Sequence, residues 1–146
     1  MNIIKWRDSY NIDIESMDMQ HKKIIELVNK LYNVIRNDES DNSIVKVLEE
    51  MTKYAEKHLQ EEEVLLKTNN YPDLTTHLAM HQLYRDRLNT LLQDLKKGNG
   101  TAVMDTYSFL RQWWTQHIMA EDKKYGVFFK SQSGGISTKQ QSPMKE

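Results

Sequence analysis

Cysteine is absent from the 146-residue sequence, and its absence excludes disulfides, iron–sulfur clusters, thiolate metal sites and cysteine nucleophiles. Any metal ion must therefore be bound by imidazole and carboxylate groups. An excess of one charge is absent too, since 20 basic and 21 acidic residues give a formal net charge of -1. This balance predicts no binding surface for nucleic acid or for an anionic membrane.

Long apolar segments are also missing. No run approaches the roughly 20 apolar residues of a membrane-spanning helix. The first residues reach Lys5 and Arg7 before the apolar core of a signal peptide could form. We therefore expect a cytoplasmic protein that does not contact a membrane, and the length predicts one domain with its own hydrophobic core.

Apolar residues at helical spacing predict four helices joined by short polar turns. Ser16 or Asp18 is expected to cap the first of them. Four helices of similar length with short connections favour an all-α fold, an antiparallel up-down-up-down four-helix bundle. The expected helices span about residues 16–36, 43–69 and 73–97, and a fourth begins at about residue 101 and ends near Gly126 or shortly after Phe129.

The two ends of the chain lack this helical period. Residues 1 to about 15 contain apolar side chains without a clear repeat and are expected to form an ordered arm laid across the bundle. Residues 131–146 are rich in serine, glycine, glutamine and lysine, and we expect a disordered tail there. The predicted domain is therefore 1–130, with the arm at 1–15.

All five histidines of the chain fall on the apolar sides of the predicted helices. A single histidine in such a place is most simply a core residue whose ring nitrogens bind backbone or hydroxyl groups. Five buried imidazoles in one small bundle need more polar partners than those helix faces offer, and a metal ion would satisfy them together. The five are His21, His58, His77, His81 and His117.

Acidic residues near two of the histidines can supply the anionic ligands that a divalent ion needs in a core. Glu62 lies four residues after His58 and on the same helix face, although Glu61 is within reach by spacing and Glu63 points away. Asp122 lies five residues after His117. The two meet only if the helix carries a π-bulge, and by regular spacing Glu121 would be the partner.

Together these elements resemble the complete ligand signature of the hemerythrin family, and in particular of its single-domain bacterial members. Two neighbouring motifs extend the resemblance, Asp18-Met19-Gln20-His21-Lys22 and Trp113-Trp114-Thr115-Gln116-His117-Ile118. The likeness covers the chain from about residue 6 to residue 129. The signature reads His21, His58-x-x-x-Glu62, His77-x-x-x-His81 and His117-x-x-x-x-Asp122.

The resemblance implies a centre of two iron ions with an oxo or hydroxo bridge, and dioxygen as the ligand. One iron would be coordinatively full, and the other would keep an open position for dioxygen. The implied ligands are His77, His81 and His117 for the first iron, His21 and His58 for the second, and Glu62 and Asp122 as bridges.

An apolar pocket around the bound dioxygen is implied as well. Its expected wall consists of Ile24, Leu59, Trp113 and Ile118. Trp113 and Ile118 coincide with positions that line the pocket in the family. For Ile24 and Leu59, ordinary core packing is an equally good interpretation.

The function predicted from these residues is reversible dioxygen binding for carriage, storage or sensing, with no catalytic residue. The alternative is a di-iron redox enzyme that acts as an oxidase or peroxidase or handles nitric oxide. A structural site for zinc or another divalent ion is a third interpretation. Oxygen-activating bundles usually carry Glu-x-x-His motifs, whereas this chain offers five histidines against two carboxylates. A protein that receives the oxygen is not identified by the sequence, and a monomer or weak oligomer is expected.

Overall fold

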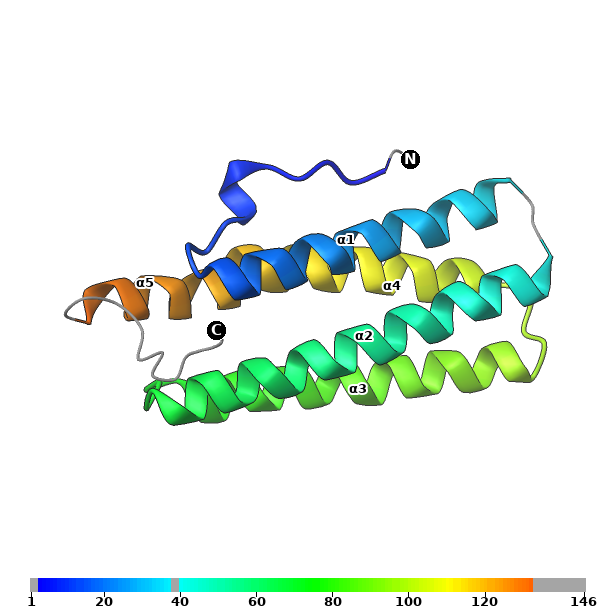
Figure 1. Cartoon of the computed structure of the whole chain (residues 1–146). Helices are drawn as coiled ribbons and strands as arrows, with labels where there is room; N and C mark the ends of the chain where they lie inside the picture. Colours follow the sequence, from blue (N-terminus) through cyan, green and yellow to red (C-terminus); the bar gives the residue numbers. More distant parts are fainter. Residues whose placement is uncertain (1–2, 38–39, 133–146) are drawn as a thin grey trace.

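Four long helices run alternately up and down and form the body of the molecule (Figure 1). The computed structural model describes residues 3–37 and 40–132, and this part of the chain contains no strand. The predicted all-α, up-down-up-down bundle is confirmed. Its helices are α1 (Glu15–Arg36), α2 (Asp41–Thr68), α3 (Leu74–Lys96) and α4 (Ala102–His117), after which the π-helix η2 (Ile118–Asp122) and α5 (Lys123–Ser131) continue the last helix.

The helix starts differ in how their free amides are satisfied. Ser40 caps α2, because its side chain accepts a hydrogen bond from the Ser43 amide. The prediction that Ser16 or Asp18 caps α1 is wrong, since both lie inside the helix, which begins after Ile14 without a side-chain cap. Asp18 instead accepts hydrogen bonds from the amides of the preceding arm, so its carboxylate fastens the arm to the helix.

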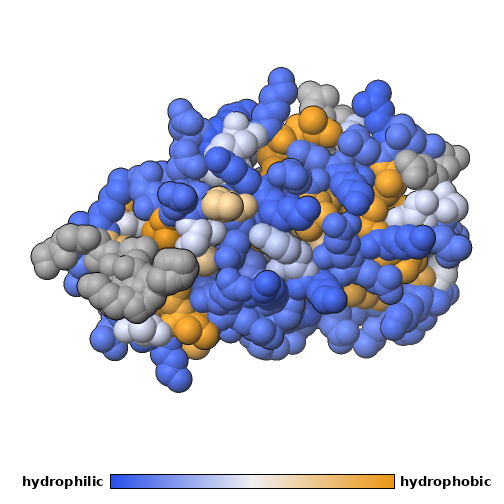
Figure 2. Space-filling view, viewed as in Figure 1, coloured by the Kyte–Doolittle hydropathy of each residue, from blue (hydrophilic) through white to orange (hydrophobic). Residues whose placement is uncertain are grey.

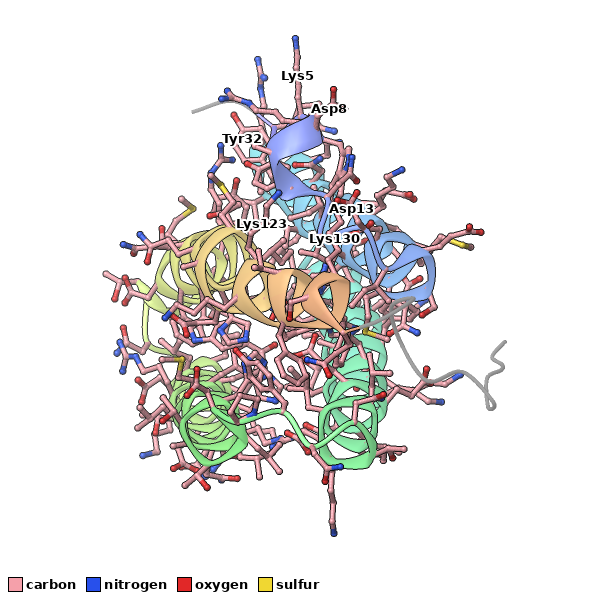
Figure 3. All side chains as sticks on the ribbon, turned by 90° about the vertical axis from the view of Figure 1, so that its left-hand side faces the viewer. Lys5, Asp8, Asp13, Tyr32, Lys123 and Lys130 are labelled. Carbon is pink, nitrogen blue, oxygen red and sulfur yellow. The ribbon has the colours of Figure 1, made fainter. Side chains whose placement is uncertain are left out.

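The arm of residues 3–14 lies along the bundle and contains the short 3-10 helix η1 (Asp8–Tyr10) (Figure 1). It crosses α5 so closely that a Cβ atom on Gly126 would lie 2.5 Å from the carbonyl oxygen of Ile12. Lys123 donates to the Asn11 carbonyl, and Lys130 pairs with Asp13 where the arm passes α5 (Figure 3). Residues 11–13 of the arm therefore contact α5 at one end of the bundle, whereas Ile4 is hydrogen-bonded to Asn29 in α1.

Apolar side chains form two buried clusters. The larger one fills most of the length of the bundle and contains Ile24, Leu59, Trp114 and Ile118. The smaller one lies at the end where the arm contacts α5, and there Tyr125 packs with residues of α1, α2 and the arm. The polar residues described below lie between the two clusters along the helices and are therefore screened from water on both sides.

The visible surface is mainly hydrophilic, with smaller apolar areas between the charged side chains (Figure 2). Among the described residues, no helix has both the length and the apolarity needed to cross a lipid bilayer. The cytoplasmic location stays a prediction. Of the expected tail, Ser131 is the last residue of α5, and residues 133–146 lie outside the described part of the chain.

Candidate metal centre

Seven polar side chains are brought together at one end of the bundle. Antiparallel neighbours place the beginnings of α1 and α3 beside the ends of α2 and α4, so residues far apart in the sequence meet there. All seven are at most 5% exposed. They are the histidines and carboxylates predicted from the sequence, His21, His58, Glu62, His77, His81, His117 and Asp122.

The π-helix η2 decides which acidic residue faces His117. On a regular α-helix, side chains five residues apart are rotated by about 140° and lie on different faces. The wider turn of η2 removes this rotation and brings Asp122 Oδ1 to 3.1 Å from His117 Nε2. Glu121 is turned away and pairs with Lys124 on the surface.

Among the three consecutive glutamates of α2, only Glu62 is completely buried. Its neighbour Glu61 lies on the exposed side and accepts a hydrogen bond from the side chain of Gln20 at 2.9 Å. The structure therefore places Glu62, and not Glu61, among the histidines.

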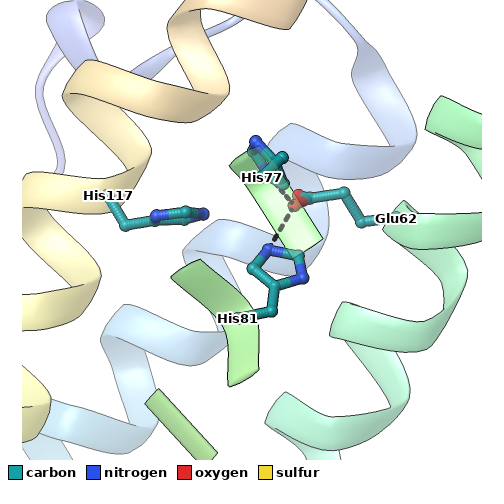
Figure 4. Close-up of side chains that lie close together, drawn as sticks. All are labelled: Glu62, His77, His81 and His117. Atoms are coloured by element: carbon teal, nitrogen blue, oxygen red, sulfur yellow. Dashed lines mark hydrogen bonds and ion pairs between the residues drawn. The ribbon is translucent and has the colours of Figure 1, made fainter. Parts of the chain in front are cut away.

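The first donor group contains three histidines. Glu62 Oε1 lies 2.8 Å from His77 Nε2 and 3.1 Å from His81 Nε2 (Figure 4). His117 approaches from α4 on the opposite side of the group (Figure 4). One ligand atom from each of Glu62, His77, His81 and His117 lies within 4.8 Å of the others, close enough to bind one ion.

The second donor group contains two histidines and shares its carboxylates with the first. Glu62 turns its other oxygen, Oε2, toward His58 at 3.2 Å. Asp122 behaves in the same way, with Oδ1 3.3 Å from His77 and Oδ2 3.0 Å from His21. Each carboxylate thus presents one oxygen to each group, which is the arrangement of a bridging ligand between two ions.

The buried polar atoms of the cluster fit a metal ion better than they fit one another. Although these nitrogens and oxygens lie near each other, several have no well-directed hydrogen bond to any described residue. An unpaired polar atom in a core is costly, and an imidazole and carboxylate set of this kind suits a divalent transition metal. The atoms are both ring nitrogens of His21, Nε2 of His58, His81 and His117, and both carboxylate oxygens of Asp122.

When no metal is bound, protons on the histidines balance part of the negative charge of the two carboxylates. Burial alone would lower the pKa of His21 and His77, but Asp122 and Glu62 outweigh it and raise the pKa to about 9 and about 10. For His58, burial dominates and lowers the pKa. Burial would raise the pKa of Glu62, yet the four nearby imidazoles hold it well below its ordinary value.

Three contacts outside the two donor groups were not predicted from the sequence. Gln20 Oε1 lies 2.6 Å from His58 Nδ1, and Glu63 Oε2 lies 2.7 Å from His81 Nδ1. The expectation that Glu63 points away is therefore wrong, because its side chain bends back to the edge of the site. Helical spacing gave no signal for this contact, which joins two helices.

Tyr125 provides the third contact and donates from its hydroxyl to Glu62 Oε2 at 2.8 Å. Burial, together with the charges of Glu62 and Asp122, raises the pKa of Tyr125 well above its ordinary value. The hydroxyl therefore stays protonated and fixes the orientation of the glutamate.

The residues expected to form an apolar wall are placed in two different ways. Ile24, Leu59 and Ile118 are fully buried members of the main core. Trp113 stacks on the ring of His117, with centroids 4.2 Å apart, and so lies beside the three-histidine group. Trp114, which the sequence did not nominate, takes the place beside the other group, because its ring meets His58 edge-on at 5.7 Å.

A four-helix bundle that buries five imidazoles and two shared carboxylates in its core belongs to the class of histidine-rich bundles whose donor atoms suit a divalent cation. The family model described as Hemerythrin HHE cation binding domain matches residues 12–128 of the sequence. This match covers most of the chain, and the protein belongs to the hemerythrin family.

Individual relatives agree with this assignment. The chain is similar to a bacteriohemerythrin of Methylococcus capsulatus, with 30% identity over 131 residues that cover 86% of this chain and 96% of the relative. It is 26% identical to a bacteriohemerythrin of Clostridium acetobutylicum, over 82% of this chain and 96% of the relative. A myohemerythrin of Theromyzon tessulatum is 23% identical over 83% of this chain and 89% of the relative.

Proposed function

We propose that the protein binds dioxygen reversibly at a non-haem di-iron centre, for carriage, storage or sensing. The observation that carries the proposal is the orientation of Glu62 and Asp122, each of which turns one oxygen to the three-histidine group and the other to the two-histidine group. Membership of the hemerythrin family and the names of the relatives support iron as the metal.

The residues have distinct roles in this proposal. His77, His81 and His117 would hold one iron, and His21 and His58 would hold the other, with the two carboxylates shared. The two-histidine group offers one imidazole fewer than the other group, so an iron held there would have room for a small ligand. When bound, the iron pair supplies the electrons that hold dioxygen.

The surrounding side chains favour reversible binding because they keep water away from the second group. Trp114, Leu59, Ile118 and Ile24 are fully buried and belong to one apolar cluster. Excluding water from such a site prevents external protons from trapping the ligand in a reduced form. Tyr125 holds Glu62 in place and stays protonated, so it donates a hydrogen bond without supplying a proton.

An oxidase or peroxidase is the competing function. Bundles that activate oxygen usually carry Glu-x-x-His motifs, in which a glutamate lies three residues before a histidine. In this chain the residues at that position before the five histidines are Asp18, Ala55, Leu74, Leu78 and Trp114. The donor set therefore supports ligand binding over oxidation chemistry.

The test is an anaerobic loading with ferrous iron, followed by exposure to oxygen and then by purging with argon. We expect a visible charge-transfer band that appears with oxygen and disappears on purging over several cycles. A rapid conversion that purging does not reverse would favour the oxidase. Protein loaded with zinc, which has no redox chemistry, is the control and should show no band. If the iron-loaded protein shows none either, the proposal fails.

A further inference from the structure

The two donor groups differ in the side chain that contacts the Nδ1 atom of one of their histidines, His81 in the first group and His58 in the second. Behind His81, in the three-histidine group, Glu63 Oε2 lies 2.7 Å from Nδ1. Arg85 holds this carboxylate with Nη1 at 3.0 Å and forms two further hydrogen bonds to Glu56, at 2.9 and 3.0 Å. His81, Glu63, Arg85 and Glu56 thus form a continuous charged chain from the buried site to the surface.

The second group has a neutral counterpart. Behind His58, the amide oxygen of Gln20 lies 2.6 Å from Nδ1, and the amide nitrogen of Gln20 is held by Glu61. Both arrangements fix the ring of the histidine and place a proton on Nδ1, so Nε2 is free to bind a metal. Only the arrangement at His81 also places a negative charge next to the ring.

That charge has a chemical consequence. A carboxylate that accepts the Nδ1 proton makes the opposite ring nitrogen a stronger donor, and removing such a partner typically weakens metal binding about 10- to 100-fold. Arg85 keeps the carboxylate in this position, because a guanidinium fork holds two carboxylates in a fixed geometry. Glu63 and Arg85 are only 21% and 24% exposed, so water competes little for either partner.

We propose that Glu63, held by Arg85, is a positioning residue that makes the three-histidine group the tighter of the two metal positions. Metal ions then fill the site in a fixed order, with the three-histidine group first and the two-histidine group second. This inference rests on the metal centre of the proposed function but is independent of dioxygen.

The order of filling is tested with Zn²⁺ alone, titrated into the metal-free protein by calorimetry. We expect two separate binding events in the unaltered protein. Nitrogen resonances of the histidine rings, followed by NMR, should show His77, His81 and His117 responding to the first equivalent and His21 and His58 to the second. If the two-histidine group responds first, or both groups respond together, the inference is wrong.

The role of Glu63 is tested with Glu63→Gln, which keeps the shape of the side chain and removes its charge. We expect the affinity of the first event to fall about 10- to 100-fold and that of the second to remain within about twofold. Arg85→Met should lower the first affinity by a smaller factor. Glu50→Gln is the matched control, because Glu50 is also an ion-paired glutamate of α2 but binds Lys30 on the surface, and both affinities should stay unchanged.

Two further readouts separate positioning from a general loss of structure. Far-ultraviolet circular dichroism should show unchanged helix content in Glu63→Gln. In the metal-free protein, the Nδ1-protonated form of His81 should dominate, and in Glu63→Ala it should mix with the other tautomer. Equal weakening of both events, or no weakening, would overturn the proposal. If zinc fills the site in order while iron-loaded protein fails to bind dioxygen, the proposed function is wrong and this inference stands.

Discussion

Glu62 contacts four histidines and one tyrosine, although its spacing in the sequence predicts a contact with His58 alone. Its two oxygens lie close to histidines from three helices, and the hydroxyl of Tyr125 adds a contact from α5. Its negative charge is buried and is balanced by the imidazoles around it. A residue in this position determines stability in the metal-free protein as well as metal binding.

Replacing Glu62 by alanine should therefore destabilise the metal-free protein strongly. Removing one member of a buried charge pair leaves the partner charge uncompensated and costs about 3–5 kcal/mol. Urea denaturation at neutral pH measures this loss as a drop in the free energy of unfolding. Glu49→Ala, on the exposed side of the same helix, should change that free energy by less than about 0.5 kcal/mol. Similar losses in the two variants would contradict the placement of Glu62 in the core.

At the scale of single elements, the contact between the arm and α5 depends on one glycine. A Cβ atom at position 126 would lie 2.5 Å from the Ile12 carbonyl oxygen and 3.0 Å from the Ile12 Cβ atom. The first of these is a backbone atom that no rotamer change can move. The arm can therefore lie on α5 only while residue 126 has no side chain.

Gly126→Ala should displace the arm and lower the free energy of unfolding by about 1–3 kcal/mol, which is typical of overpacking in a core. Limited proteolysis should show faster cleavage within residues 3–14. Gly100→Ala serves as the control, since a Cβ atom at that position would meet no other atom within 4 Å and the φ angle is unexceptional. An arm that stays protected in Gly126→Ala would show that the contact is not a close one.

Helical spacing in the sequence predicts part of this arrangement and misses the rest. The helices and the buried histidines follow from apolar spacing, because a side chain four residues on lies on the same face. The choice between Glu121 and Asp122 does not follow from apolar spacing. It depends on the π turn of η2, which regular spacing does not reveal. Glu63 was misplaced for a related reason, since its partner His81 lies on another helix.

For the whole molecule, protonation and metal binding compete for the same cluster. The raised pKa values of His21 and His77, about 9 and about 10, mean that both rings are protonated at neutral pH without metal. A metal ligand must be a neutral imidazole, so metal binding has to release these protons. Charge in the core is therefore balanced by either protons or metal ions.

Zinc binding at pH 7 should release protons, and the affinity should rise as the pH is increased toward 9. The measurement is calorimetry of zinc binding in buffers with different ionisation enthalpies. If protons are released, the buffer takes them up and the measured heat differs from one buffer to the next. A binding heat that is the same in all buffers would contradict the raised pKa values of the two histidines.

The same pKa values give a stability that depends on pH. Because they lie above the ordinary value of 6.5, the protonated rings stabilise the metal-free fold fully below pH 6.5, and this contribution is lost as the pH rises through 9 to 10. The metal-free protein should therefore melt at a lower temperature at pH 10 than at pH 7. The zinc-loaded protein should show a smaller difference, since its imidazoles are neutral at both pH values.

The site occupies one end of the bundle, and the turn between α3 and α4 lies at the other. None of the seven clustered side chains belongs to that turn, and Gly98 adopts a positive φ angle of 77° within it. A reporter domain joined through residue 99 would therefore sit a helix length away from the metal cluster. The far turn is a natural attachment point for linking this centre to a second protein without disturbing it.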